Sequence, residues 1–74
     1  MNRLRGLQGV EVRRALERTG FGLARQRGSH VRMKHADGRA VTIPCHSGQV
    51  LGRGLIRKIL RDAELTEDEF LELI

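Results

Sequence analysis

The sequence predicts an α+β fold in which two helices pack on one face of a three-stranded antiparallel sheet, in the order α-β-β-β-α, followed by a short C-terminal helix. Apolar residues recur at helical spacing early and late in the chain, and polar and apolar residues alternate between these two segments. A helix-start motif lies near the C-terminal end. Because 74 residues suffice for one small core, we expect a single domain over residues 1–74.

The first helix is expected over about residues 9–18. Its mostly apolar stripe follows the i, i+3, i+4, i+7 spacing of one helix face, at Val12, Ala15, Leu16 and Thr19. Gly20 is a stop signal just after the stripe. Gln8 precedes the helix, and glutamine caps a helix less well than Ser, Thr, Asp or Asn, so we expect a weakly capped start.

Three strands are expected over residues 21–27, 29–35 and 39–43. They are joined across Gly28 and across a hairpin turn at Asp37-Gly38, and Pro44 ends the third strand. Alternation places four side chains toward the helices: Val31, Met33, Val41 and Ile43. It places four others on the opposite face: His30, Arg32, Lys34 and Thr42. An imidazole therefore shares a face with two cations.

A glycine-rich loop over residues 46–54 leads to the second helix. The apolar set of that helix is Leu55, Ile56, Ile59, Leu60 and Ala63. The last helix begins at a capping box in which Thr66 and Glu69 each bond the other's backbone amide, with Leu65 and Phe70 placed as the hydrophobic staple.

The composition excludes several functional classes. The chain has two Phe and no Trp or Tyr, so it lacks the base-stacking platforms of many single-strand RNA binders. Cys45 is alone, and no HExxH motif or cysteine pair occurs, so we expect no disulfide, no metal and no cofactor. Residues 48–54 lack the Lys-Ser/Thr of a nucleotide-binding loop. No apolar run is long enough to span a bilayer, and we expect a cytoplasmic protein with no membrane partner.

The charges are divided along the chain. Residues 1–61 hold all 14 Lys and Arg and only three acids, a net charge of +11, whereas residues 62–74 hold six acids and no base. A field this positive attracts polyanions, and such binding weakens as salt rises. The acidic segment complements the N-terminal dipole of the last helix and repels nucleic acid from that end.

His30 is the candidate catalytic residue. It follows Gly28-Ser29 and lies among cations, with Arg25, Arg27, Arg32, Lys34 and Ser29 as candidate RNA- or phosphate-binding residues. Histidine takes and gives a proton near neutrality, and cations stabilise the charge that develops when the 2′-hydroxyl of RNA attacks the adjacent phosphorus. The other interpretation is that His30 only makes a hydrogen bond across the Gly28 turn.

Two further residues are candidate phosphate contacts. His46 comes just after the third strand, where it either approaches a phosphate or orients the loop. Arg53 lies at the start of the second helix, where the positive end of the helix dipole favours an anion. His35 is on the other alternation face from His30 and is expected to be structural or solvated.

Several motifs in sequence order resemble the HicA toxin family. They are Gly20-Phe21, Arg25-Gln26-x-Gly28-Ser29-His30, Asp37-Gly38-Arg39, Ile43-Pro44-x-His46-x-Gly48, Gly54-Leu55-Ile56-x-x-Ile59-Leu60-Arg61 and Leu65-Thr66-x-x-x-Phe70. The resemblance covers almost the whole chain, and the Gln-x-Gly-Ser-His string is its most specific part.

The resemblance implies a small mRNA interferase with a double-stranded-RNA-binding-domain-like fold, neutralised by a HicB antitoxin encoded beside it. His30 would be the catalytic histidine of an endoribonuclease that cleaves mRNA by metal-independent transesterification. The expected partners are therefore mRNA and a HicB-like antitoxin. The alternative is a non-catalytic RNA-binding module that uses the same fold and basic face.

Overall fold

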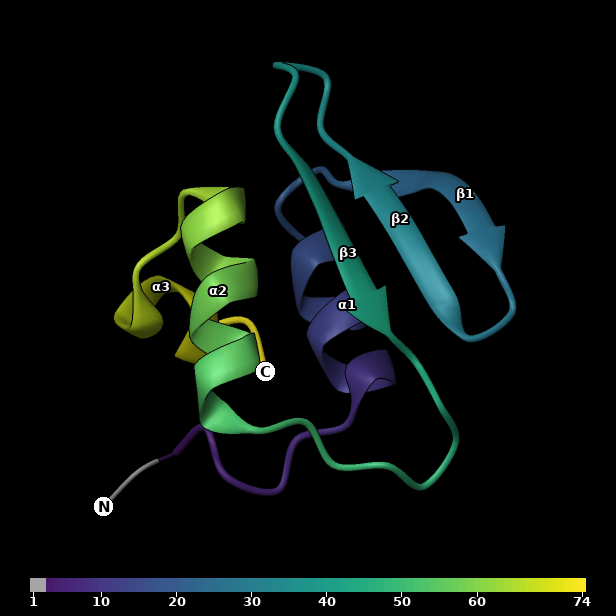
Figure 1. Cartoon of the computed structure of the whole chain (residues 1–74). Helices are drawn as coiled ribbons and strands as arrows, with labels where there is room; N and C mark the ends of the chain where they lie inside the picture. The colour runs from purple at the N-terminus through teal and green to yellow at the C-terminus, as the bar shows by residue number, and fades with distance from the viewer. Residues whose placement is uncertain (1–2) are drawn as a thin grey trace.

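The computed structural model describes residues 3–74 and contains three helices and three strands within them (Figure 1). In chain order they are α1 (Gly9–Glu17), β1 (Gly22–Arg27), β2 (His30–Lys34), β3 (Ala40–Pro44), α2 (Arg53–Ala63) and α3 (Glu67–Leu71). The predicted α+β order is confirmed. The predicted strand ends differ from the observed ones by at most one residue, and α2 begins at Arg53, before its first apolar residue.

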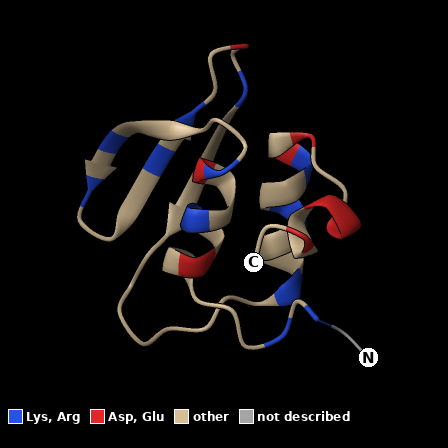
Figure 2. Cartoon of the chain, turned by 180° about the vertical axis from the view of Figure 1, so that it is seen from behind, with Lys and Arg blue, Asp and Glu red and all other residues tan. Residues whose placement is uncertain are grey.

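The sheet is antiparallel with the strand order β1-β2-β3, and α1 and α2 lie on one of its faces (Figures 1 and 2). The predicted alternation along β2 and β3 is confirmed. The side chains toward the helices are at most 1% exposed: Val31, Met33, Val41 and Ile43. Those on the other face are exposed: His30, Arg32, Lys34 and Thr42. None of the helices within residues 3–74 covers this second face, the open face of the sheet.

The helices contribute most of the rest of one apolar core, and Leu4, Phe21 and Leu51 join it from the connecting segments. Val12, Ala15 and Leu16 come from α1, and Ile56, Ile59, Leu60 and Ala63 come from α2. Phe70 of α3 is fully buried in the same cluster. The short acidic helix is thus fixed to the core by an aromatic side chain, as its capping motif and staple predict.

The start of α1 is held by neighbouring segments. The Glu11 carboxylate accepts a hydrogen bond from the Gln8 backbone amide at 3.3 Å, and Gln8 forms an isolated bridge with Val50. Gly9 lies so close to the end of β3 that a Cβ atom there would be 1.9 Å from the Pro44 carbonyl oxygen. These contacts compensate for the poor capping ability of Gln8.

The start of α3 has the reciprocal bonds that its sequence predicts. The Glu69 amide donates to the Thr66 hydroxyl at 3.1 Å, and the Thr66 amide donates to the Glu69 carboxylate at 2.8 Å.

Among residues 3–74, the helices are too short or too polar to cross a membrane.

Candidate functional site

A shallow hollow of about 170 Å³ lies on the open face of the sheet. All three strands contribute to its lining, which consists of Arg25, Arg27, His30, Arg32 and Thr42. Four of the residues that the sequence singled out, His30 and three arginines, therefore meet in one place. The hollow combines an imidazole with three guanidinium groups, which is the chemistry of a phosphate-binding site with one proton-transfer group.

A β-bulge brings the arginines of β1 into the hollow. Leu23 pairs with Met33, but the next register pair is Arg25 with Arg32, so Ala24 is an extra residue in β1. In a regular strand Leu23 and Arg25 would share a face. Because of the bulge, Arg25 instead lies beside Arg32 on the open face, and Arg27 lies beside its register partner His30.

The backbone around His30 is fixed on both sides. Gly28 and Ser29 form the two-residue turn between β1 and β2, and the positive φ of 59° at Gly28 matches a type II′ turn, which has glycine first. On the other side, the Cys45 amide donates to the Ser29 carbonyl at 2.7 Å, just beyond the register pair of His30 with Pro44. His30 thus lies on the central strand, which pairs with β1 on one side and with β3 on the other.

The charges of the hollow are not neutralised by carboxylates. Among residues 3–74, the ion pairs of Lys and Arg join Arg13 to Glu17, Arg39 to Asp37, Arg57 to Glu67 and Lys58 to Asp62. None of these pairs involves a lining residue of the hollow. Figure 2 shows basic residues along the strands and acidic residues gathered on α3. The open face therefore presents uncompensated positive charge to solvent.

The remaining predicted contacts lie outside the hollow. Lys34 shares the open face but is at the other end of β2, opposite Ala40. His46 is exposed in the loop after β3, and Arg53 is exposed at the first position of α2. Ser29 contributes its backbone carbonyl to the strand pairing. The structure brings none of these four side chains into the lining.

Thr42 is a lining residue that the sequence-based list of phosphate contacts missed. Arg32 Nη1 donates to its hydroxyl at 3.0 Å across β2 and β3. The signal available in the sequence was its place on the open face, which alternation gave correctly. Thr42 is uncharged, so the charge pattern of the sequence does not single it out. Its partner Arg32 follows from the pairing of β2 with β3.

His35 has a structural environment, as expected. Its Nε2 lies 3.1 Å from the Thr19 carbonyl oxygen, its Nδ1 accepts a hydrogen bond from the Asp37 amide at 3.2 Å, and its ring meets Phe21 edge-on at 5.3 Å. Burial raises the pKa of the Cys45 thiol, which makes it a weaker nucleophile at neutral pH. Neither residue lines the hollow.

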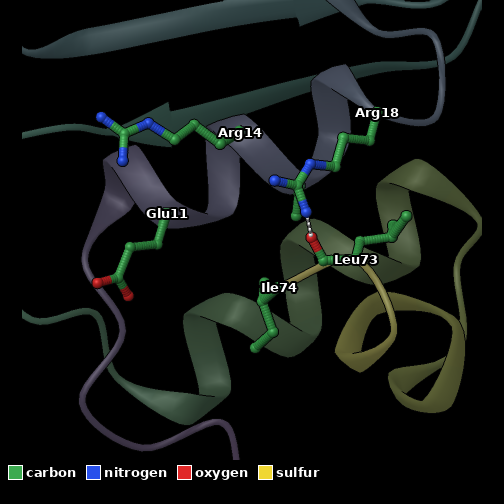
Figure 3. A pocket seen from close by; sticks show the side chains of 6 residues that line it. Glu11, Arg14, Arg18, Leu73 and Ile74 are labelled. Carbon is green, nitrogen blue, oxygen red and sulfur yellow. Dashed lines mark hydrogen bonds between the residues drawn. The ribbon is translucent and has the colours of Figure 1, made fainter.

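A second hollow of about 220 Å³ lies on the helical side, between α1 and the end of the chain (Figure 3). Its lining mixes both charges with apolar groups: Glu11, Arg14, Ala15, Arg18, Leu73 and Ile74. Arg18 donates to the Leu73 carbonyl, and the charged ends of Glu11 and Arg14 point away from Ile74. This bond ties the last residues to α1, so the second hollow has a structural explanation.

Among residues 3–74, no group of three or more His, Cys, Asp or Glu side chains is placed to hold a metal ion. The lining of the first hollow presents an imidazole, three guanidinium groups and a hydroxyl.

Comparison with known proteins identifies the family. The family model described as HicA toxin of bacterial toxin-antitoxin matches residues 9–65, which include every strand, α1, α2 and the whole lining of the hollow on the open face. No curated protein matches the chain. The family match spans 57 of the 74 residues. The chain therefore belongs to the HicA family, the toxins of bacterial toxin–antitoxin systems.

Proposed function

We propose that this toxin is an endoribonuclease that cleaves mRNA by transesterification without a metal ion. The 2′-hydroxyl attacks the adjacent phosphorus and loses its proton, the bond from phosphorus to the 5′-oxygen breaks, and that oxygen gains a proton. The products are a 2′,3′-cyclic phosphate and a 5′-hydroxyl end. His30 transfers one of the two protons, and Arg25, Arg27 and Arg32 bind the phosphate whose charge increases in the transition state.

The observation that carries this proposal is the meeting of His30 with three arginines in a hollow that contains no carboxylate. An unpaired guanidinium forms strong, often bidentate hydrogen bonds with phosphate oxygens. The imidazole lines the same hollow from the central strand, so a phosphate held there by the arginines would lie beside it.

The partner that we propose for this toxin is a HicB-like antitoxin that covers the open face. An acidic surface would complement the uncompensated arginines, and covering His30 would prevent both RNA binding and cleavage. The proposal thus assigns inhibition and activity to the same surface.

The replacement His30→Ala tests the catalytic role. We expect it to lower the cleavage rate of a labelled mRNA by about 10² to 10⁴-fold, the usual contribution of one proton-transfer group, with EDTA present to silence metal-dependent contaminants. RNA affinity should change little, because the arginines remain. Arg61→Ala is the matched control, since this exposed arginine of α2 lies outside the hollow. The Arg61→Ala protein should cleave RNA at the wild-type rate.

Undiminished cleavage by purified His30→Ala protein would overturn the catalytic assignment. Tight RNA binding without any cleavage by the wild type would instead favour the non-catalytic RNA-binding module. Circular dichroism of each variant excludes unfolding as the cause of lost activity.

A further inference from the structure

The hollow on the open face has one lining residue with no ionisable group, Thr42, and it is hydrogen-bonded to an arginine. Thr42 of β3 and Arg32 of β2 are register partners, and Arg32 Nη1 donates to Thr42 Oγ1 at 3.0 Å. Both side chains line the hollow together with His30. The hydrogen bond therefore fixes one of the three guanidinium groups at the proposed site of phosphate binding.

Arg32 needs such a contact because its other neighbour is also positive. Its register partner on β1 is Arg25, so two arginines lie directly opposite each other on adjacent strands. Like charges directly opposite each other in a sheet repel, and an arginine side chain has many rotamers by which to turn away. Among residues 3–74, no carboxylate pairs with Arg32 to hold it.

We propose that Thr42 is a positioning residue that holds the Arg32 guanidinium over the hollow beside His30, an inference that rests on the proposed ribonuclease function. A guanidinium has five N–H donors, so the bond to Thr42 leaves the others free for phosphate oxygens. Thr42 acts through Arg32 and does not itself contact the reacting atoms. The hydroxyl group, which valine lacks and serine retains, is the feature that matters.

A double-mutant cycle tests this role. Single-turnover cleavage of a labelled mRNA is measured for the wild type, Thr42→Val, Arg32→Ala and the double variant. Loss of a hydrogen bond to a charged group predicts a rate about tenfold lower for Thr42→Val. In the Arg32→Ala background, Thr42→Val should have no further effect, because the group that Thr42 positions is gone.

Two controls separate positioning from a general structural effect. Thr42→Ser should restore the rate to within about twofold of the wild type, since it keeps the hydroxyl. Combined with Arg61→Ala, which lies outside the hollow, Thr42→Val should retain its full tenfold effect. A wild-type rate for Thr42→Val, failure of serine to rescue, or independent effects of Thr42→Val and Arg32→Ala would each overturn the inference.

Failure of the proposed function has a different result. If the wild type does not cleave RNA, the ribonuclease proposal is wrong, and the same four proteins are compared by their Kd for a fluorescently labelled single-stranded RNA. The Thr42→Val effect on Kd should again vanish in the Arg32→Ala background. Effects on Kd that are independent of Arg32 would overturn the positioning role in that case too.

Discussion

At the residue scale, Gly9 is the position where the backbone leaves no room for a side chain. It is the first residue of α1, and its Cα faces the Pro44 carbonyl at the end of β3. The residue after Pro44 is Cys45, whose backbone amide donates a hydrogen bond to the carbonyl of Ser29, the residue before His30. The start of α1 thus packs against the end of β3, and this end of β3 is hydrogen-bonded to the backbone next to the candidate catalytic histidine.

A pair of glycine replacements tests this close packing. In Gly9→Ala the new Cβ would lie 1.9 Å from the Pro44 oxygen, so the backbone must move. We expect a loss of about 2 kcal/mol, which corresponds to a melting temperature lower by about 10 °C in a chain of this size. Thermal unfolding followed by circular dichroism measures the change.

Gly54→Ala is the matched control. Gly54 lies in the first turn of α2, and a Cβ atom there would meet nothing within 4 Å. Alanine restricts the unfolded chain more than glycine does, so this variant should melt at the wild-type temperature or a few degrees higher. Destabilisation of equal size in both variants would contradict the steric explanation.

At the element scale, α3 depends on its capping box as well as on Phe70. Hydrogen bonds with Thr66 lower the pKa of Glu69 from its ordinary value of 4.5. The bond with the Thr66 backbone amide has the larger effect, and the bond with the Thr66 side chain has the smaller one. The ionised carboxylate therefore stabilises the folded state above the unfolded pKa. That stabilisation is lost as the pH falls through the lower folded pKa.

The replacement Glu69→Gln should make unfolding less sensitive to acid. Between about pH 6 and pH 3, the free energy of unfolding of the wild type should fall more than that of the variant. Urea titrations across this range measure the difference. Glu72→Gln, in the same acidic segment, controls for the loss of one negative charge, and indistinguishable curves for the two variants would contradict the assignment.

The elements differ in how well the sequence predicts them. In β2 and β3 every second side chain is buried, so polarity reveals both faces and the open-face position of His30, Arg32 and Thr42. The start of α3 is equally clear, because its capping box is a local motif. These predictions succeed because the relevant physics acts within a few residues of chain.

β1 is the element that the sequence predicts least well. All six of its residues are exposed, so burial imposes no alternation that can be read from polarity. Its bulge exists through pairing with β2, and Arg25 reaches the hollow through that pairing. The bond between Arg32 and Thr42 likewise depends on the register of two strands, which sequence spacing alone does not give.

At the scale of the whole molecule, the arginines of the hollow and the acidic cluster of α3 occupy different surfaces. Basic side chains line the open face, whereas acidic ones gather on α3, which lies beside α2 (Figure 2). Two of the basic side chains on α2 are paired with acids from the C-terminal segment. On the open face, a polyanion would therefore meet arginines that form no ion pair within residues 3–74.

The salt dependence of RNA binding tests this distribution of charge. For the double variant Arg25→Ala/Arg27→Ala, the slope of log binding constant against log salt should be smaller in magnitude by about 1.4, or about 0.7 for each lost phosphate contact with single-stranded RNA. Fluorescence anisotropy at four or five salt concentrations gives the slope. Arg61→Ala should keep the wild-type slope, and an unchanged slope in the double variant would show that RNA binds elsewhere.

The bulge in β1 also affects how the chain should be aligned with its relatives. Because Ala24 has no register partner, removing one residue there would exchange the faces of the residues on one side of it. A relative that lacks this residue would therefore present different β1 side chains to the hollow, even if it retained every arginine. Equivalent positions in β1 are best counted backward from the Gly28 turn, where strand pairing fixes them, and not forward from the end of α1.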